Sequence, residues 1–263
     1  MKRALPLALA AVAFAFLVLP VVAIFLRVPP GHLLHQLTSP IVTDALVVSL
    51  KTSAIAQALI LVFGTPLAWV LASRRFRGRA LAITLVELPL VLPPAVAGIG
   101  LLAAFGHTTG LLHTSIPFTQ TAVVFAVAFV ASPLYVRQAI AAFEAVDPNL
   151  VAASRTLGAG PGRTFFRVVL PLARNGLAAG EALAFARGLG EFGATIMFAG
   201  SLQGVTQTLP LAIYSAFAID FDTALAMGAL LVVVSALLLL FLKLVLSWRP
   251  SRPTSSFLFA RSR

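Results

Sequence analysis

The sequence predicts an all-α polytopic membrane protein, a single domain of about six transmembrane helices. Only 10% of its 263 residues are charged, 60% are hydrophobic, and the mean hydropathy is +1.02. A soluble domain carries about 25% charged residues, so this chain has too few for an ordinary water-facing surface. Long apolar runs alternate with short basic clusters, a pattern of membrane topology. The net charge of +11 therefore does not indicate a nucleic-acid partner.

Six apolar stretches are candidates for the helices of about 20 residues that cross a bilayer. They are Leu5–Leu26, Ala45–Ala72, Leu81–Phe105, Thr121–Val136, Gly176–Ala199 and Thr223–Leu246. The fourth is short, and we expect it to extend to about Phe143. The first follows Met1-Lys2-Arg3 and could be a signal peptide, but it exceeds the apolar core of about 7–15 residues typical of such peptides. We expect a retained extra helix at about 5–26 before a core at about 44–246.

Lysine and arginine lie almost entirely on one side of these spans. Fifteen occupy one set of segments: Lys2, Arg3, Arg74, Arg75, Arg77, Arg79, Arg137, Arg155, Arg163, Arg167, Arg174, Arg249, Arg252, Arg261 and Arg263. The opposite set holds only Arg27. Because positively charged segments stay in the cytoplasm, both termini are predicted to be cytoplasmic, including a basic tail at 247–263. The even number of spans agrees.

Catalytic and metal-binding patterns are missing from the sequence. There is no cysteine, and no carboxylate lies near His32 and His35, which are three residues apart. Two histidines alone do not make a zinc site, so we expect a solvated segment there and no metal. Zinc-protease, serine-hydrolase and nucleotide-loop motifs are also missing. We expect no enzyme activity and no cofactor bound by this chain; energy for uphill transport would come from another chain or an ion gradient.

Charged residues inside membrane spans are costly and usually functional. Here they are Lys51, Glu87, Glu181, Arg187, Glu191 and Lys243. Lys243 lies near the inner end of its span, where a lysine can extend to the head groups. Arg187 and Glu191 are four residues apart and can pair on one helix face. That pairing fits structural neutralisation at least as well as a direct substrate role.

Two segments carry helix-breaking residues inside the spans. Leu88–Pro94 contains three prolines, which lack the backbone donor and kink a helix. Arg187–Gly193 contains three glycines, which loosen a helix. Broken backbone at membrane depth is tolerated where it is buried or lines a watery cavity. The predicted translocation pathway or gate comprises Lys51, Pro89, Pro93, Pro94, Arg187, Gly190, Glu191, Gly193 and Thr195. Close packing through small residues is the alternative.

The connection at about 144–172 has the pattern of a folded unit. A short helix is expected to end near Leu157, with Gly158 at its carboxyl end in a positive φ. A glycine-rich turn follows, and then a second amphipathic segment that Pro171 is expected to stop.

This loop resembles the coupling loop of ABC-importer permeases, whose pattern is Glu-Ala-Ala, three residues, Gly, nine residues, Ile-x-Leu-Pro. Ala153, Gly158, Leu170 and Pro171 match the pattern, and Val168 stands in for isoleucine. Ala152 and Ser154 depart from it. The resemblance implies contact with an ATPase through Arg155, Thr156, Leu157, Gly158, Ala159, Gly160, Leu170 and Pro171.

Further segments resemble molybdate-transport permeases, over about Asp44–Tyr214. They are residues 88–94, 155–160, 184–195 and 208–214. Sulfate/thiosulfate permeases share much of the Gly190–Gly193 stretch, and tungstate permeases are similar. The resemblance implies a type I ABC-importer fold that imports molybdate, or alternatively tungstate or sulfate/thiosulfate. It implies a homodimer in the lipid membrane, two cytoplasmic ATPase subunits that use the ATP, and an extracytoplasmic oxyanion-binding protein. An ion-driven secondary transporter is the less favoured class, because no inverted repeat is visible.

Overall fold

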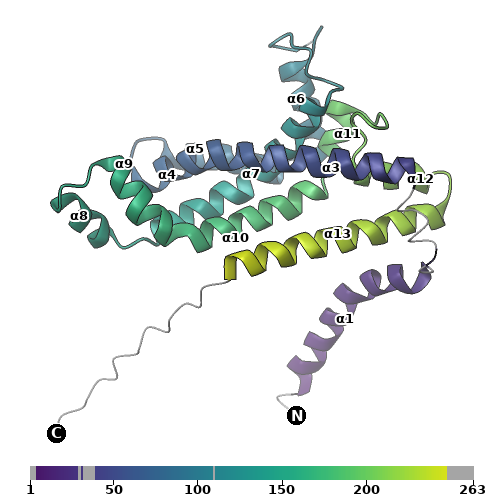
Figure 1. Ribbon diagram of the computed structural model, residues 1–263, viewed down its shortest axis with the longest axis horizontal. Coiled ribbons are helices and arrows are strands. Elements are labelled where there is room, and N and C mark those ends of the chain that lie inside the picture. Colours follow the sequence, from purple (N-terminus) through teal and green to yellow (C-terminus); the bar gives the residue numbers. More distant parts are fainter. Residues whose placement is uncertain (1–3, 29–30, 32–38, 109, 248–263) are drawn as a thin grey trace.

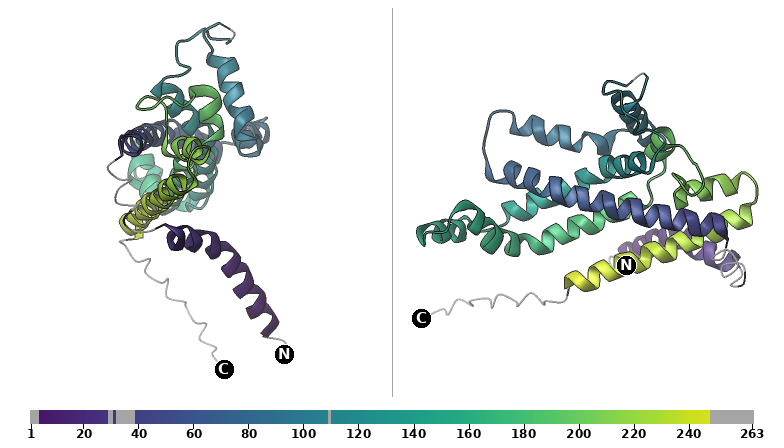
Figure 2. Two further views of the ribbon diagram at one scale, coloured as in Figure 1. Left: turned by 90° about the vertical axis from the view of Figure 1, so that its right-hand side faces the viewer. Right: turned by 45° about the horizontal axis from the view of Figure 1, so that its top comes forward.

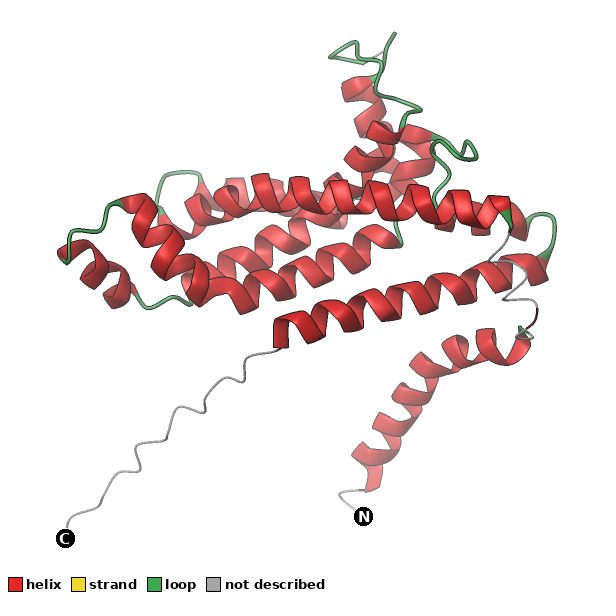
Figure 3. Ribbon diagram, viewed as in Figure 1, coloured by secondary structure: helices red, strands yellow, loops and turns green. Residues whose placement is uncertain are grey.

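The computed structural model describes residues 4–28, 31, 39–108 and 110–247, and in that part of the chain all regular structure is helical (Figures 1 and 3). His32, His35, Lys2, Arg3 and all but the first residue of the predicted tail lie outside the described residues. The same holds for the side chain of Lys243.

The helices follow one another along the whole described chain. They are α1 (Ala4–Arg27), α3 (Pro40–Leu59), the π-helix η1 (Ile60–Gly64), α4 (Thr65–Ser73), α5 (Arg79–Val91), α6 (Pro94–Phe105), α7 (Gln120–Glu144), α8 (Pro148–Thr156), α9 (Pro161–Thr164), the π-helix η2 (Phe165–Val169), α10 (Leu170–Leu189), α11 (Gly193–Ala199), α12 (Leu209–Phe217) and α13 (Phe221–Ser247).

Helix α7 is the centre of the bundle. It packs against α3, α4, α5, α6, α10 and α11, and its buried face includes Ala126, Ala131 and Ala139, which have no exposed surface. Small side chains let neighbouring backbones approach closely, which favours helix association in lipid. Helices α3, α4 and α10 run alongside it, α13 lies against α10, and α8 and α9 are at one end (Figures 1 and 2). Helix α1 diverges from the bundle and packs on α13, where the Arg27 guanidinium lies 5.5 Å from the centre of the Phe221 ring.

Four of the predicted spans are confirmed as long apolar helices, running over Leu5–Arg27, Pro40–Ser73, Gln120–Glu144 and Phe221–Phe241 within the described residues. Helices α5 and α6 form a fifth if the bent pair is counted as one span. Helix α10 is 20 residues long but carries three charged residues, so composition alone does not mark it as a span. The expected count of about six is therefore approximate.

The third and fifth predicted spans are each broken, as the proline and glycine segments inside them predicted. Helices α5 and α6 meet at a 115° bend, because Pro93 and Pro94 interrupt the hydrogen-bond ladder. The fifth helix begins earlier than expected and ends at Leu189; Gly190 leaves the helical conformation, and α11 starts afresh at Gly193. The segment at 200–222, expected to be only an outer connection, also contains helix α12.

Pro171 does not stop the second segment of the loop, contrary to the prediction. It lies in the first turn of α10, directly after η2. In this π-helix the Leu170 N–H bonds to the Phe165 carbonyl, five residues back. The wider turn accommodates a proline ring that would clash with a regular α-helical carbonyl. Pro66 likewise lies in the first turn of α4, directly after η1. As a result, α9, η2 and α10 form one continuous helical rod.

Candidate functional site

The two predicted breaks come together in the structure. A Cβ added to Gly193 would lie 2.7 Å from Pro94 Cβ, and one added to Gly98 would lie 2.6 Å from the Ala194 carbonyl oxygen. Helices α6 and α11 therefore touch backbone to backbone at the place where each helix restarts (Figure 1). We call this contact, made by residues 93–98 and 190–195, the junction. Pro93, Pro94, Gly190, Glu191, Gly193 and Thr195 belong to it.

Glu191 holds the junction together. Its Oε2 lies 2.7 Å from Arg187 Nη1, and its Oε1 accepts a 2.7 Å hydrogen bond from the Ala194 N–H. The predicted Arg187–Glu191 pair is thus confirmed, but the two residues do not share a helix, because α10 ends at Leu189. The carboxylate, whose side chain is 1% exposed, links the end of α10 to the first turn of α11.

Neutral hydrogen-bonding groups lie buried nearby. The Thr195 side chain is completely buried, and its hydroxyl has no hydrogen-bond partner in the described part of the chain. Gln57 of α3 is 5% exposed, and neither of its amide atoms has a partner there. A Cβ on Gly188 would lie 3.2 Å from Gln57 Nε2, which places this amide against the end of α10. Such buried, unpaired groups are rare in folded proteins.

Gln57 was not among the predicted pathway residues, because it is uncharged and lies outside the two segments with helix-breaking residues. A signal was available, since Gln57 is the one polar residue between Ala54 and Phe63. An uncharged amide is also expensive to bury without a partner.

Other predicted pathway residues lie apart from the junction. Lys51 Nζ donates a 2.9 Å hydrogen bond to Gln120 Oε1 at the start of α7. It precedes Gln57 by six residues, which is about 9 Å along a helix. Pro89 lies inside α5. Two further charged residues of the spans also lie elsewhere. Glu87 Oε1, in the same helix as Pro89, lies 3.6 Å from Arg137 Nε. The Oε2 atom of Glu181 is buried without a hydrogen-bond partner among the described residues.

The tip of the 144–172 loop has the predicted helix ending. The Gly158 N–H bonds to the Arg155 carbonyl at 2.9 Å, and the Ala159 N–H bonds to the Ser154 carbonyl at 3.1 Å. This pair of bonds is the Schellman arrangement, which places a glycine in the left-handed region. Gly158 has φ +83°, as predicted. Leu157, beside it, is 88% exposed, so an apolar side chain points into solvent at the tip.

Helix α8 is fixed at both ends. Asp147 Oδ1 accepts a 2.9 Å hydrogen bond from the Asn149 N–H at its start, with Pro148 in the first turn. The Ser154 hydroxyl lies 3.1 Å from that of Thr164 on α9. Ser154, a departure from the coupling-loop pattern, therefore joins the two short helices.

One rod connects the tip to the junction. Leu170 and Pro171, predicted to contact an ATPase, form the first turn of α10, with Leu170 half-buried and Pro171 exposed. Helix α10 extends for 20 residues, which is about 30 Å. Its last turn carries Arg187, the partner of Glu191. A continuous helical rod therefore leads from the segment after the tip to the junction.

Known proteins share both the sequence and the fold. Residues 64–251 match the family described as the binding-protein-dependent transport system inner membrane component. The Molybdenum transport system permease protein ModB of Mycobacterium tuberculosis is 45% identical over 232 residues, covering 86% of this chain and 88% of the relative. The chain belongs to the molybdenum-permease family of ABC importers. The Escherichia coli ModB permease is 42% identical to it over 179 residues, covering 65% and 78% of the two chains.

Solved transporters show the same architecture for this permease. A chain of the bacterial alginate ABC transporter superposes with a TM-score of 0.75 at 16% identity, covering 93% of this chain and 94% of the other. A chain of the MetNI methionine transporter gives a TM-score of 0.59 at 19% identity, covering 79% and 94%. The fold is that of type I ABC-importer permeases, and the protein is a multi-pass membrane protein.

Proposed function

We propose that this permease is the transmembrane subunit of an ATP-driven importer that carries molybdate into the cell by alternating access, with the whole chain acting as one permease domain. The observation that supports it most is the 45% identity to a molybdenum permease over most of both chains. Tungstate and sulfate/thiosulfate are the alternative substrates, because these tetrahedral dianions differ little in shape and charge.

The partners in this proposal are two ATPase subunits at the α8 tip and an oxyanion-binding protein on the other side, around a homodimer of this chain. ATP hydrolysis belongs to the ATPase, so we assign this chain no catalytic residue and no cofactor. A structural neighbour supports the arrangement, since the bacterial alginate transporter was solved in complex with a pentasaccharide-bound periplasmic protein. The exposed Leu157 and the glycine-rich turn form a small apolar protrusion that the ATPase could contact.

The geometry supports a path with weak substrate affinity. The charge of Arg187 is largely balanced by Glu191, and the buried donors without a partner described beside the junction, Gln57 and Thr195, are neutral. A tight anion site gathers several charged donors. Weak binding suits transport because the ion must also leave. Selection of molybdate is then left mainly to the binding protein.

The orientation in the membrane follows from the fifteen-to-one distribution of basic residues. We propose that the termini, the 74–79 connection and the α8 tip are cytoplasmic. The chain has no cysteine, so Gly158→Cys would carry the sole thiol. An impermeant thiol reagent should label it in inverted vesicles and not in intact cells; labelling in intact cells would reverse the orientation.

Reconstitution tests the function directly. The permease, its ATPase and its binding protein are placed in proteoliposomes, and ATP hydrolysis is followed with molybdate, tungstate or sulfate. We expect molybdate to stimulate hydrolysis and uptake more than sulfate does. Stimulation by sulfate and not by molybdate would indicate a sulfate permease. Uptake without the ATPase would favour an ion-coupled transporter.

A further inference from the structure

A cavity of about 590 Å³ lies beside the coupling segment and separate from the junction. It is bounded by the end of α4, the start of α5, the end of α7, α8 and η2. Its volume falls within the range of about 300–1,000 Å³ typical of small-molecule sites. The proposed transport mechanism does not use the space itself, although Arg155 of its lining is also a predicted ATPase contact. The lining combines strong positive charge with an apolar wall.

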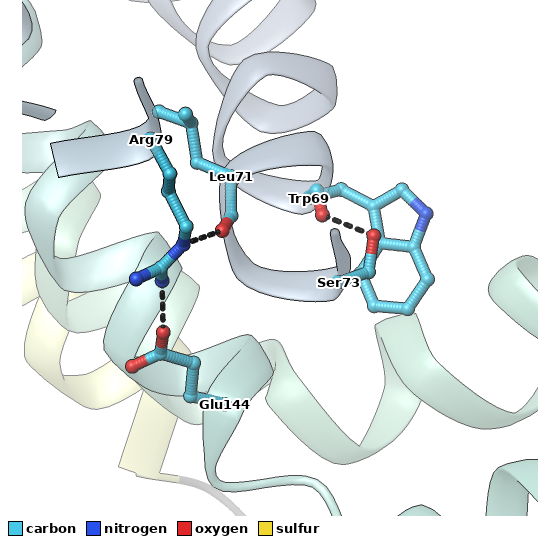
Figure 4. Close-up of polar contacts among 5 residues, drawn as sticks. All are labelled: Trp69, Leu71, Ser73, Arg79 and Glu144. Atoms are coloured by element: carbon cyan, nitrogen blue, oxygen red, sulfur yellow. Dashed lines mark hydrogen bonds and ion pairs between the residues drawn. The ribbon is translucent and has the colours of Figure 1, made fainter. Parts of the chain in front are cut away.

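Three arginines line the cavity: Arg75, Arg79 and Arg155. Arg79 is already engaged, because it pairs with Glu144 and its Nε donates a 2.7 Å hydrogen bond to the Leu71 carbonyl (Figure 4). This contact ties α5 to α4 and α7. The side chains of Arg75 and Arg155 have no hydrogen-bond or ion-pair partner in the described part of the chain. With Glu144 balancing Arg79, the cavity carries two uncompensated positive charges.

Part of the lining is aromatic, from Trp69 and Phe143. The Trp69 ring packs on Phe143 at a centroid distance of 5.4 Å and on Phe165 at 5.3 Å. Ser73, which also lines the cavity, donates a 2.7 Å hydrogen bond to the Trp69 carbonyl (Figure 4). Tryptophan is enriched where a membrane helix reaches the head groups. A ligand for this cavity should therefore be anionic at one end and apolar at the other.

We propose that this cavity binds an anionic phospholipid, with Arg75 and Arg155 contacting its phosphate and Trp69 contacting the glycerol and the start of the acyl chains. The cavity lies at the ends of α4 and α7, where a spanning helix meets the head-group layer. Basic pockets between membrane helices on the cytoplasmic side favour such head groups. A soluble phosphate compound would gain little from the apolar wall.

The proposed lipid joins the coupling helix to the bundle. Arg155 belongs to α8, whereas Arg75 lies between α4 and α5. A phosphate held by both would connect the tip to the transmembrane helices through a component of the membrane itself. The lipid site does not depend on which oxyanion is transported.

Native mass spectrometry of the full-length permease tests this site with matched lipids, dioleoyl phosphatidylglycerol against dioleoyl phosphatidylcholine. The wild type should retain phosphatidylglycerol preferentially. The Arg75→Gln/Arg155→Gln variant should lose about tenfold or more of that affinity, because each arginine near a membrane surface contributes appreciably to binding anionic lipid. The control, Arg77→Gln/Arg163→Gln, removes the same charge from exposed arginines outside the cavity and should keep the preference.

Arg75 and Arg155 are both exposed, and their substitution leaves the Arg79–Glu144 pair intact, so the cavity variant should fold. Thermal unfolding of that variant checks this. Equal lipid retention by wild type and cavity variant would overturn the proposal. So would arginine-dependent binding of inorganic phosphate or glycerol phosphate with no preference for the lipid, which would mark a site for a soluble anion. Loss of ATPase co-purification with unchanged lipid binding would instead make these arginines protein contacts.

Discussion

The junction and the α8 tip both require glycine, but for opposite physical reasons. At the junction, Gly98 and Gly193 have ordinary backbone angles and no room, since an added Cβ would lie within 2.7 Å of a neighbouring helix. At the tip, Gly158 has open space within 4 Å but a φ of +83°. The first requirement concerns volume, and the second concerns backbone conformation.

This difference separates what each region can tolerate. The junction is buried and held by a charged residue, so it should respond to changes of a single methyl group or charge. The tip is exposed and held by backbone hydrogen bonds, so it should respond mainly to the φ preference of one residue. Four substitutions, taken from the largest expected effect to the smallest, test that contrast.

Arg187→Gln should have the largest effect on stability. It leaves the Glu191 carboxylate, 1% exposed, without its ion pair, so the carboxylate must stay charged in a buried place or take up a proton. Removing one partner of a fully buried pair destabilises a protein by about 3–5 kcal/mol. The loss here should lie at the lower end of that range, because the Arg187 side chain is 34% exposed. Thermal unfolding of the permease in lipid nanodiscs measures the loss.

The matched control is the double variant Arg187→Gln/Glu191→Gln. It removes both charges and keeps an amide that can still accept from the Ala194 N–H, so it should recover much of the lost stability. If the single variant unfolds at the wild-type temperature, the pair does not hold the junction. If the double variant is stable but does not transport, the charges of the pair serve transport itself.

Gly98→Ala should come next. The new Cβ would lie 2.6 Å from the Ala194 carbonyl and 2.7 Å from Met197 Cβ, so α6 and α11 must separate. Overpacking of this kind destabilises by about 1–3 kcal/mol. Gly100→Ala is the control in the same helix, because nothing lies within 4 Å of its added Cβ. Equal unfolding temperatures for the two variants would show that the helices do not need this close approach.

The parts of the molecule that depend on composition and local preference could be predicted from the sequence. Long apolar runs are sufficient for α1, α7 and α13, and the Gly158 ending follows from local backbone preferences. The Arg187–Glu191 contact was also predicted from spacing, although the helix that was expected to carry it ends before Glu191.

The remaining features depend on contacts between distant segments. The glycines in 187–193 loosen a helix without specifying where it ends, and only the packing of α6 on α11 fixes the restart at Gly193. Pro171 was expected to end a helix, because proline disrupts a regular α-helix and the amino-acid sequence does not reveal the π-helix η2 that accommodates it. Gln57 was missed for a different reason, since an uncharged side chain gives no electrostatic signal.

Gly158→Val tests the tip. The side chain has space, so the penalty is the left-handed backbone, about 1–2 kcal/mol per non-glycine residue. We expect a correctly inserted permease with weakened ATPase docking and no uptake. Gly160→Val adds the same side chain two residues later, where there is open space and φ is −67°. This control should bind the ATPase better than Gly158→Val does. Normal uptake by Gly158→Val would show that the loop is an ordinary connection.

Ser154→Ala should have the smallest effect, because it removes one hydroxyl contact and leaves the Schellman bonds in place. The Ser154 Oγ–Thr164 Oγ1 pair, at 3.1 Å, joins α8 to α9, and a typical hydrogen bond contributes about 0.5–1.5 kcal/mol. Amide hydrogen exchange in α8 and α9 should rise several-fold. Thr156→Ala is the control, since its hydroxyl bonds only within α8, to the Ala152 carbonyl. The coupling-loop pattern of ABC-importer permeases, which this loop resembles, has alanine at the position of Ser154, so uptake should stay close to that of the wild type. A large loss of uptake would mean that rigid attachment of α8 to the rod, and not its backbone shape, limits coupling in this permease.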